Sequence, residues 1–195
     1  MMTEQFIQTP SQTVGPYFAY GLTSEQYQYN HTQVADGNLI KNEKIKGERI
    51  DIKGCVFDGE GNIIPDAMIE IWQADADGKY PGPGAKDHFT GFGRQGTGTV
   101  ADGSFLFNTI KPGSINGAAP HITVIVFMRG LQTHAYTRIY FSDEVASNQQ
   151  DVVLNLVDAK RRITLIAQRT EAGDIIEYRF DIYMQGEKET VFFDV

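Results

Sequence analysis

From residue 48 onward, short apolar segments are separated by turn sequences rich in Gly, Asp and Pro. Residues 67–73 carry Ile69 and Ile71 on one face, which is the period-two pattern of a half-buried strand. Residues 121–128 are apolar on both faces, as expected for a central strand that is covered on each side. Further strands are expected at 49–57, 105–110, 134–141, 153–157, 162–169, 175–185 and 190–194. This spacing predicts an all-β fold, a β-sandwich of mainly antiparallel strands with little helix, over residues 48–195.

The first 47 residues have a different pattern. Gly15 and Pro16 disfavour a regular helix, yet aromatic residues cluster between positions 17 and 20, which is unusual for a disordered tail. We therefore expect an extended arm over residues 3–20 that is pinned onto another surface, followed by a short helix that begins at 23–26. Residues 1–47 are predicted to contact a partner.

Composition and charge narrow the class of protein. The 195 residues carry a net charge of −8, which argues against nucleic acid or an anionic membrane as a partner, because both need a basic face. The longest apolar run, at 122–128, is too short to cross a membrane, and the N-terminal sequence has no secretory pattern. Cys55 is the single cysteine, so no internal disulfide forms. We expect a cytoplasmic protein.

One sequence motif lacks the structural context that its function requires. Residues 91–96 fit the GxGxxG pattern of dinucleotide-binding loops, which requires a helix directly afterwards to meet the pyrophosphate. A hairpin turn follows instead, so the segment is predicted to be an ordinary loop.

Three stretches carry a specific resemblance: 71–80 (IWQADADGKY), 107–113 (FNTIKPG) and 119–123 (APHIT). In this order the chain resembles the intradiol ring-cleavage dioxygenases, non-haem ferric enzymes built on a β-sandwich. The resemblance runs from about residue 8 to the C-terminus and includes the segments 9–17 and 186–193.

In that family two tyrosinates and two histidines hold Fe(III), a hard ion that is well matched by anionic oxygen donors. By resemblance, Tyr80 and His121 stand at two of the four ligand positions. The other two are occupied by Ile115 and Thr123, which cannot replace a tyrosinate and an imidazole. The resemblance therefore implies that this chain holds no metal and has no catalytic residues on its own.

Some members of the family pair two homologous chains, and both ends of this sequence match the type that binds no iron. The resemblance implies a large α/β hetero-oligomer in which the β chain binds Fe(III). The assembly would cleave protocatechuate (3,4-dihydroxybenzoate) with O2 to 3-carboxy-cis,cis-muconate, in the β-ketoadipate pathway. Arg129 would contact the substrate carboxylate, since its planar fork suits bidentate pairing. The substrate pocket of the partner would also be lined by Thr13, Gly15, Pro16 and Tyr17.

Two other hypotheses remain open. The chain would be a stand-alone β-sandwich binding or structural module if it has no affinity for a homologous chain. It would be a self-sufficient iron enzyme if Tyr80 and His121 were joined by another donor such as His134, although nothing in the sequence places His134 beside them.

Overall fold

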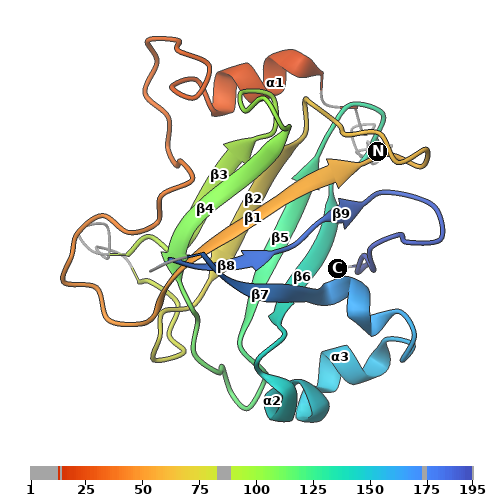
Figure 1. Ribbon diagram of the computed structural model, residues 1–195. Helices are drawn as coiled ribbons and strands as arrows, with labels where there is room; N and C mark the ends of the chain where they lie inside the picture. Colours follow the sequence, from red (N-terminus) through yellow and green to blue (C-terminus); the bar gives the residue numbers. More distant parts are fainter. Residues whose placement is uncertain (1–12, 14, 83–88, 173–174, 195) are drawn as a thin grey trace, which may run out of the picture.

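The computed structural model describes residues 13, 15–82, 89–172 and 175–194 (Figure 1). In this part of the chain nine strands form one sheet in the order β3-β2-β5-β6-β7-β8-β1-β4, with β9 paired to β1. The strands are β1 (Arg49–Phe57), β2 (Met68–Gln73), β3 (Phe92–Gly96), β4 (Ser104–Ile110), β5 (His121–Phe127), β6 (Ala135–Phe141), β7 (Ile166–Ala172), β8 (Ile175–Arg179) and β9 (Ile182–Tyr183).

The sheet is mixed but mainly antiparallel, since only the pairs β1–β8, β1–β9 and β6–β7 run parallel. It curls until its two edge strands, β3 and β4, lie side by side, so the fold is close to a closed barrel (Figure 1). The predicted all-β class with little helix is confirmed.

The seam between β3 and β4 is closed by the segment 36–39. The N–H of Arg94 on β3 donates to the carbonyl of Asp36 (3.0 Å), and that of Asn108 on β4 donates to the carbonyl of Gly37 (2.8 Å). A Cβ atom on Gly37 would lie 2.6 Å from the carbonyl oxygen of Leu106, so only glycine fits there. The boundary at residue 47 stays a prediction, although this segment is hydrogen-bonded into the sheet.

Alternate side chains of the strands point inward and make one apolar core. Its members are buried residues from every side of the barrel, among them Ile52, Ile71, Phe107, Val124, Ile139 and Tyr178. On β5 the inward positions are fully buried, whereas Thr123, Ile125 and Phe127 on the other face are only partly covered. The predicted central place of β5 is confirmed, but its outer face is less covered than expected.

Three predictions for strands towards the C-terminal end were wrong in whole or in part. Residues 153–157 were expected to extend, but α3 spans Val152–Leu156, because the Asp151 side chain accepts from the Leu154 N–H and caps the helix. Residues 162–165 form a 3-10 turn before β7, and 190–194 contribute only an isolated bridge between Tyr136 and Phe193. The helices of this region, α2 (Val145–Gln150), α3 and the 3-10 turn, are all short. Within the described residues no helix is long and apolar enough to span a membrane.

The prediction of a loop at 91–96 was also wrong, since β3 pairs there with β2 in the register Ile71 to Gly93. Its sequence, FGRQG, has glycines and polar residues where a half-buried strand would show apolar alternation. The ladder to β2, rather than intrinsic preference, makes this segment extended.

From Pro16 onward the arm is helical and not extended. Helix α1 spans Pro16–Leu22 and begins on Pro16, a position whose N–H needs no partner within the helix. Pro16 was expected to disfavour a helix, but it occupies the first position of α1. The helix expected from 23–26 is replaced by turns. Residues 1–12 and 14 lie outside the described part of the chain.

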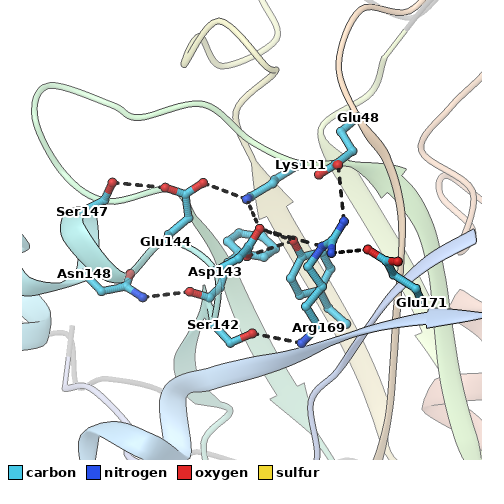
Figure 2. A network of polar contacts seen from close by, with 11 residues as sticks. Glu48, Lys111, Ser142, Asp143, Glu144, Ser147, Asn148, Arg169 and Glu171 are labelled. Atoms are coloured by element: carbon cyan, nitrogen blue, oxygen red, sulfur yellow. Dashed lines mark hydrogen bonds and ion pairs between the residues drawn. The ribbon is translucent and has the colours of Figure 1, made fainter.

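A polar cluster joins the end of β4 to β6, β7 and β8 (Figure 2). Lys111 Nζ lies 2.7 Å from both Asp143 Oδ2 and Glu144 Oε1, and the Tyr178 hydroxyl lies 3.0 Å from both oxygens of Asp143. Burial alone would lower the pKa of Lys111, but its hydrogen bonds to the two carboxylates raise that pKa above its usual value. The cluster ties the C-terminal strands to the rest of the barrel.

Candidate functional site

The first group of candidate residues lies around a turn that follows β5. Residues 128–131 form this turn, with Gly130 at φ +89° and the Leu131 N–H directed at the Met128 carbonyl (3.4 Å). The Arg129 side chain is 63% exposed, and its Nε lies 2.7 Å from Asp66 Oδ2. Arg129 is therefore presented at the surface, with its Nε in ion-pair contact with Asp66.

The arm meets this turn directly. The N–H of Gly130 donates to Thr13 Oγ1 at 2.9 Å, and the Phe18 ring in α1 packs 5.8 Å from the ring of Phe127, the last residue of β5. Gly15 is the extended N-cap residue of α1 (φ −95°, ψ 173°), which Pro16 and Tyr17 continue as the first helical residues. Thr13 and Arg129, predicted from the sequence to share one function, thus lie on adjoining segments.

A second group lies on the outer face of β2, β5 and β6. Trp72, Thr123 and Arg138 are direct cross-strand neighbours and so form one row. Tyr80 stacks on Trp72 with ring centroids 5.5 Å apart and planes 7° from parallel, and both side chains are about two-fifths exposed, at 43% and 37%. Tyr80, which stands at one of the family's tyrosine ligand positions, is therefore part of an aromatic pair on this face.

His121 is buried at the end of the same face. Its Nδ1 lies 2.8 Å from the Ala119 carbonyl oxygen, which makes Nδ1 the protonated nitrogen of a neutral ring. Burial lowers the pKa of His121 below its usual value, although the bond to the Ala119 carbonyl opposes this. The ring packs 5.8 Å from that of Tyr140, its cross-strand neighbour on β6.

Sequence reasoning missed the hub of this region, Asp151. Its buried carboxylate accepts from the Tyr140 hydroxyl (3.0 Å), the Ala119 N–H (2.9 Å) and the Leu154 N–H (2.7 Å). Burial would raise the pKa of Asp151, but the two backbone amides hold it below its usual range. Burial also raises the pKa of Tyr140 to about 12, so the phenol stays protonated. Aspartate is so common at turns that the sequence carried no signal for this role.

The residues present do not fit a four-ligand ferric site. Ile115 is half-buried, bridges to Ala118 across a tight turn and has no donor atom, and Thr123 offers only a neutral hydroxyl. In the described residues no three His, Cys, Asp or Glu side chains come together as a metal-binding group. His134 contacts the Tyr136 hydroxyl through Nε2 at 2.8 Å and packs against Phe127 near the Arg129 turn, away from the His121 end of β5.

Comparison with known proteins identifies the family to which this chain is similar. Residues 15–120 match the family model described as dioxygenase. The chain is 53% identical to the protocatechuate 3,4-dioxygenase alpha chain of Burkholderia cepacia, over 96% of this chain and 98% of that protein. It is 31% identical to the beta chain from the same organism, over 78% of this chain and 71% of the beta chain. An intradiol ring-cleavage dioxygenase from Tetranychus urticae shares the fold, with a TM-score of 0.62 at 20% identity over 91% of this chain and 94% of that one.

Proposed function

The chain belongs to the dioxygenase family, among the intradiol ring-cleavage enzymes, and we propose that it is the alpha subunit of a protocatechuate 3,4-dioxygenase. The observation that carries the proposal is the 53% identity to an alpha chain over nearly the full length of both proteins. The alternatives, a stand-alone module or a self-sufficient iron enzyme, have no counterpart of comparable identity among the relatives described above.

The proposed partner is a homologous beta chain, and the similarity of this chain to a beta chain supports a common ancestor for the two. Members of this family use non-haem iron. We assign the Fe(III) to the beta chain because Ile115 and Thr123 leave this chain with two of the four donors. When bound there, the iron would supply the chemistry that joins O2 to the ring. A cytoplasmic location accords with the single, buried Cys55, which forms no disulfide.

In the proposed reaction, protocatechuate and O2 give 3-carboxy-cis,cis-muconate. The bond between the two hydroxylated ring carbons breaks, and each of these carbons becomes a carboxylate that keeps one atom of O2, so both oxygen atoms end in the product. The ring carboxylate takes no part in the bond changes. The ring carboxylate is therefore a group that a protein can bind in order to hold and orient the substrate.

Arg129 is the proposed partner of that carboxylate. A guanidinium stays charged at all physiological pH values and pairs with a carboxylate through two parallel N–H donors. Asp66 contacts the Nε edge, so the two terminal nitrogens form the edge that is suited to an incoming carboxylate. The exposure of the side chain supports contact with a ligand held by a neighbouring subunit.

The arm is proposed to complete the pocket. The hydrogen bond between Thr13 and Gly130 supports this role, because it brings Thr13 to the same surface as Arg129. In the proposed assembly Thr13, Gly15, Pro16 and Tyr17 line the beta chain's substrate pocket on the side of the carboxylate.

The test is to produce this chain and a beta chain separately and together, and to measure assembly by size-exclusion chromatography and ring cleavage by O2 consumption. We expect a stable mixed oligomer, with activity that requires both chains. A chain that stays monomeric in the presence of the beta chain would contradict the proposal and favour the stand-alone module.

A further inference from the structure

We propose that Asp66 is a positioning residue that fixes the Arg129 guanidinium in the orientation that receives the substrate carboxylate. This inference rests on the role proposed above for Arg129. It starts from the 2.7 Å contact between Asp66 Oδ2 and Arg129 Nε, which joins a turn before β2 to the turn after β5.

The two partners differ sharply in burial. The Asp66 side chain is 16% exposed, whereas that of Arg129 is 63% exposed. Oδ2 of Asp66 is itself fully buried, and the described residues offer it no aligned hydrogen bond. Because a buried carboxylate oxygen is stabilised by a nearby cation, Asp66 holds the stem of Arg129 while the end of that side chain reaches into solvent.

The backbone around Asp66 is well fixed. The hydroxyl of Thr97, which is completely buried, donates to the Ile64 carbonyl (2.8 Å) and accepts from the Ala67 N–H (3.1 Å). These contacts bracket Asp66 on both sides, so its carboxylate projects from a rigid turn. A fixed anchor is what a positioning residue requires.

The geometry of the contact explains why it positions without occupying the site. A guanidinium has two edges that can meet a carboxylate, one made by Nε with a terminal nitrogen and one made by the two terminal nitrogens. Asp66 lies at Nε, and in the described residues it is the only acidic partner of Arg129. The terminal edge is therefore held in place and kept available.

Asp66 has two opposite effects on a bound carboxylate. Its negative charge weakens the attraction of Arg129 for the substrate, whereas its fixed position removes the cost of ordering a long, exposed side chain, which is worth up to about tenfold in binding. We infer that ordering dominates, because an exposed guanidinium acts through water-screened charges but still needs a defined direction for bidentate pairing.

The experiment uses the assembled α/β enzyme and compares KM for protocatechuate with KM for catechol, which has no carboxylate. For Asp66→Ala we expect KM for protocatechuate to rise about three- to tenfold. The kcat for both substrates and the KM for catechol should stay unchanged. Asp66→Asn keeps an oxygen acceptor of the same size and is expected to restore most of the loss. A matched control is Glu171→Ala, which removes the carboxylate beside another arginine, the half-buried Arg169 on β7.

Arg129→Ala and the double variant Asp66→Ala/Arg129→Ala separate the positioning role of Asp66 from the carboxylate-binding role of Arg129. If Asp66 acts through Arg129, adding Asp66→Ala to Arg129→Ala changes KM no further. An Arg129→Ala enzyme with normal KM for protocatechuate would contradict the role of Arg129 itself. A normal or lower KM in Asp66→Ala, beside a raised KM in Arg129→Ala, would overturn only the positioning role. If Asp66→Ala does not assemble, Asp66→Ser, whose side chain is too short to reach Arg129 Nε, gives the same comparison in both backgrounds.

Discussion

Thr13 Oγ1 accepts a hydrogen bond from the Gly130 N–H at 2.9 Å, and this contact joins the start of the described chain to the turn after the central strand β5. The neighbour of Gly130 is Arg129, whose guanidinium is anchored by Asp66. Three segments that are far apart in the sequence therefore meet at one surface.

Replacement of Arg129 should separate two substrates of the assembled enzyme. Arg129→Ala removes a charge-assisted bidentate pair, so KM for protocatechuate should rise roughly 30- to 100-fold, corresponding to about 2–3 kcal/mol. KM for catechol should change less than about twofold, since it has no carboxylate. Steady-state kinetics on both substrates gives the answer, and an equal loss on the two would remove the carboxylate-binding role.

The contact between Thr13 and Gly130 should affect the same substrate more weakly. Thr13→Val keeps the shape of the side chain but removes the acceptor, so the Arg129 turn loses about 1 kcal/mol of restraint. We expect KM for protocatechuate to increase by about threefold, and Thr13→Ser, which keeps the hydroxyl, to resemble the wild type. If Thr13→Val and Thr13→Ser have the same KM, the hydrogen bond has no functional part.

Asp151 should matter for stability far more than an exposed aspartate. Asp151→Ala leaves the Tyr140 hydroxyl and the Ala119 N–H without their acceptor and removes the cap of α3, at a cost of about 3 kcal/mol. Asp77→Ala, at an exposed position, is the matched control and should be nearly neutral. Urea unfolding of the two variants compares them, and similar midpoints would show that Asp151 is not a hub.

Lys111 should contribute more to the free energy of unfolding than an exposed lysine that has one acidic partner. The Lys111 side chain is only 15% exposed, and its removal takes the nearest cation from both Asp143 and Glu144, so that Asp143 keeps only the longer contact with Arg169 at 3.9 Å (Figure 2). Lys111→Met is expected to lower the free energy of unfolding by about 2 kcal/mol. Lys41→Met, which breaks the exposed pair with Asp36, should cost less than about 0.5 kcal/mol in the same assay.

His121 should make the fold sensitive to mild acid. Because the folded pKa of His121 is lowered, the unfolded chain binds more protons below the usual value of 6.5, so stability falls as the pH drops below that value. Asp151, whose pKa is also lowered, adds its own loss only below its usual value of 3.8. His121→Gln should flatten the unfolding free energy between pH 7 and 5, and an unchanged slope would exclude this cause.

Much of the fold could be predicted where side chains alternate. The strands β1, β2, β4, β5 and β6 follow their apolar patterns closely. Strand β3 could not be predicted in this way, because Gly93 and Gly96 are extended by pairing with β2 rather than by their own preference. The sequence pattern does not predict α1, because proline can either start or break a helix, nor α3, because Val152 and Leu156, although apolar, face outward on a capped turn.

Resemblance in the sequence proposes the residues of the candidate site but does not give their contacts. Resemblance identified Arg129 and Thr13, and the structure brings their segments together. The pairing of Asp66 with Arg129 depends on how the turns before β2 and after β5 meet, which no local pattern encodes. The same holds for Asp151 and Tyr140, since a cap on α3 and a residue of β6 become neighbours only in the folded barrel.

The central claim is that this chain works as the subunit that does not hold iron, and the iron content of the chain purified alone tests it most directly. The chain should be produced without a beta partner in iron-supplemented cells, and its iron and visible spectrum measured. The account predicts a colourless chain with far less than one iron per molecule. One iron per chain, with the red-brown absorption of a tyrosinate–Fe(III) bond, would contradict it.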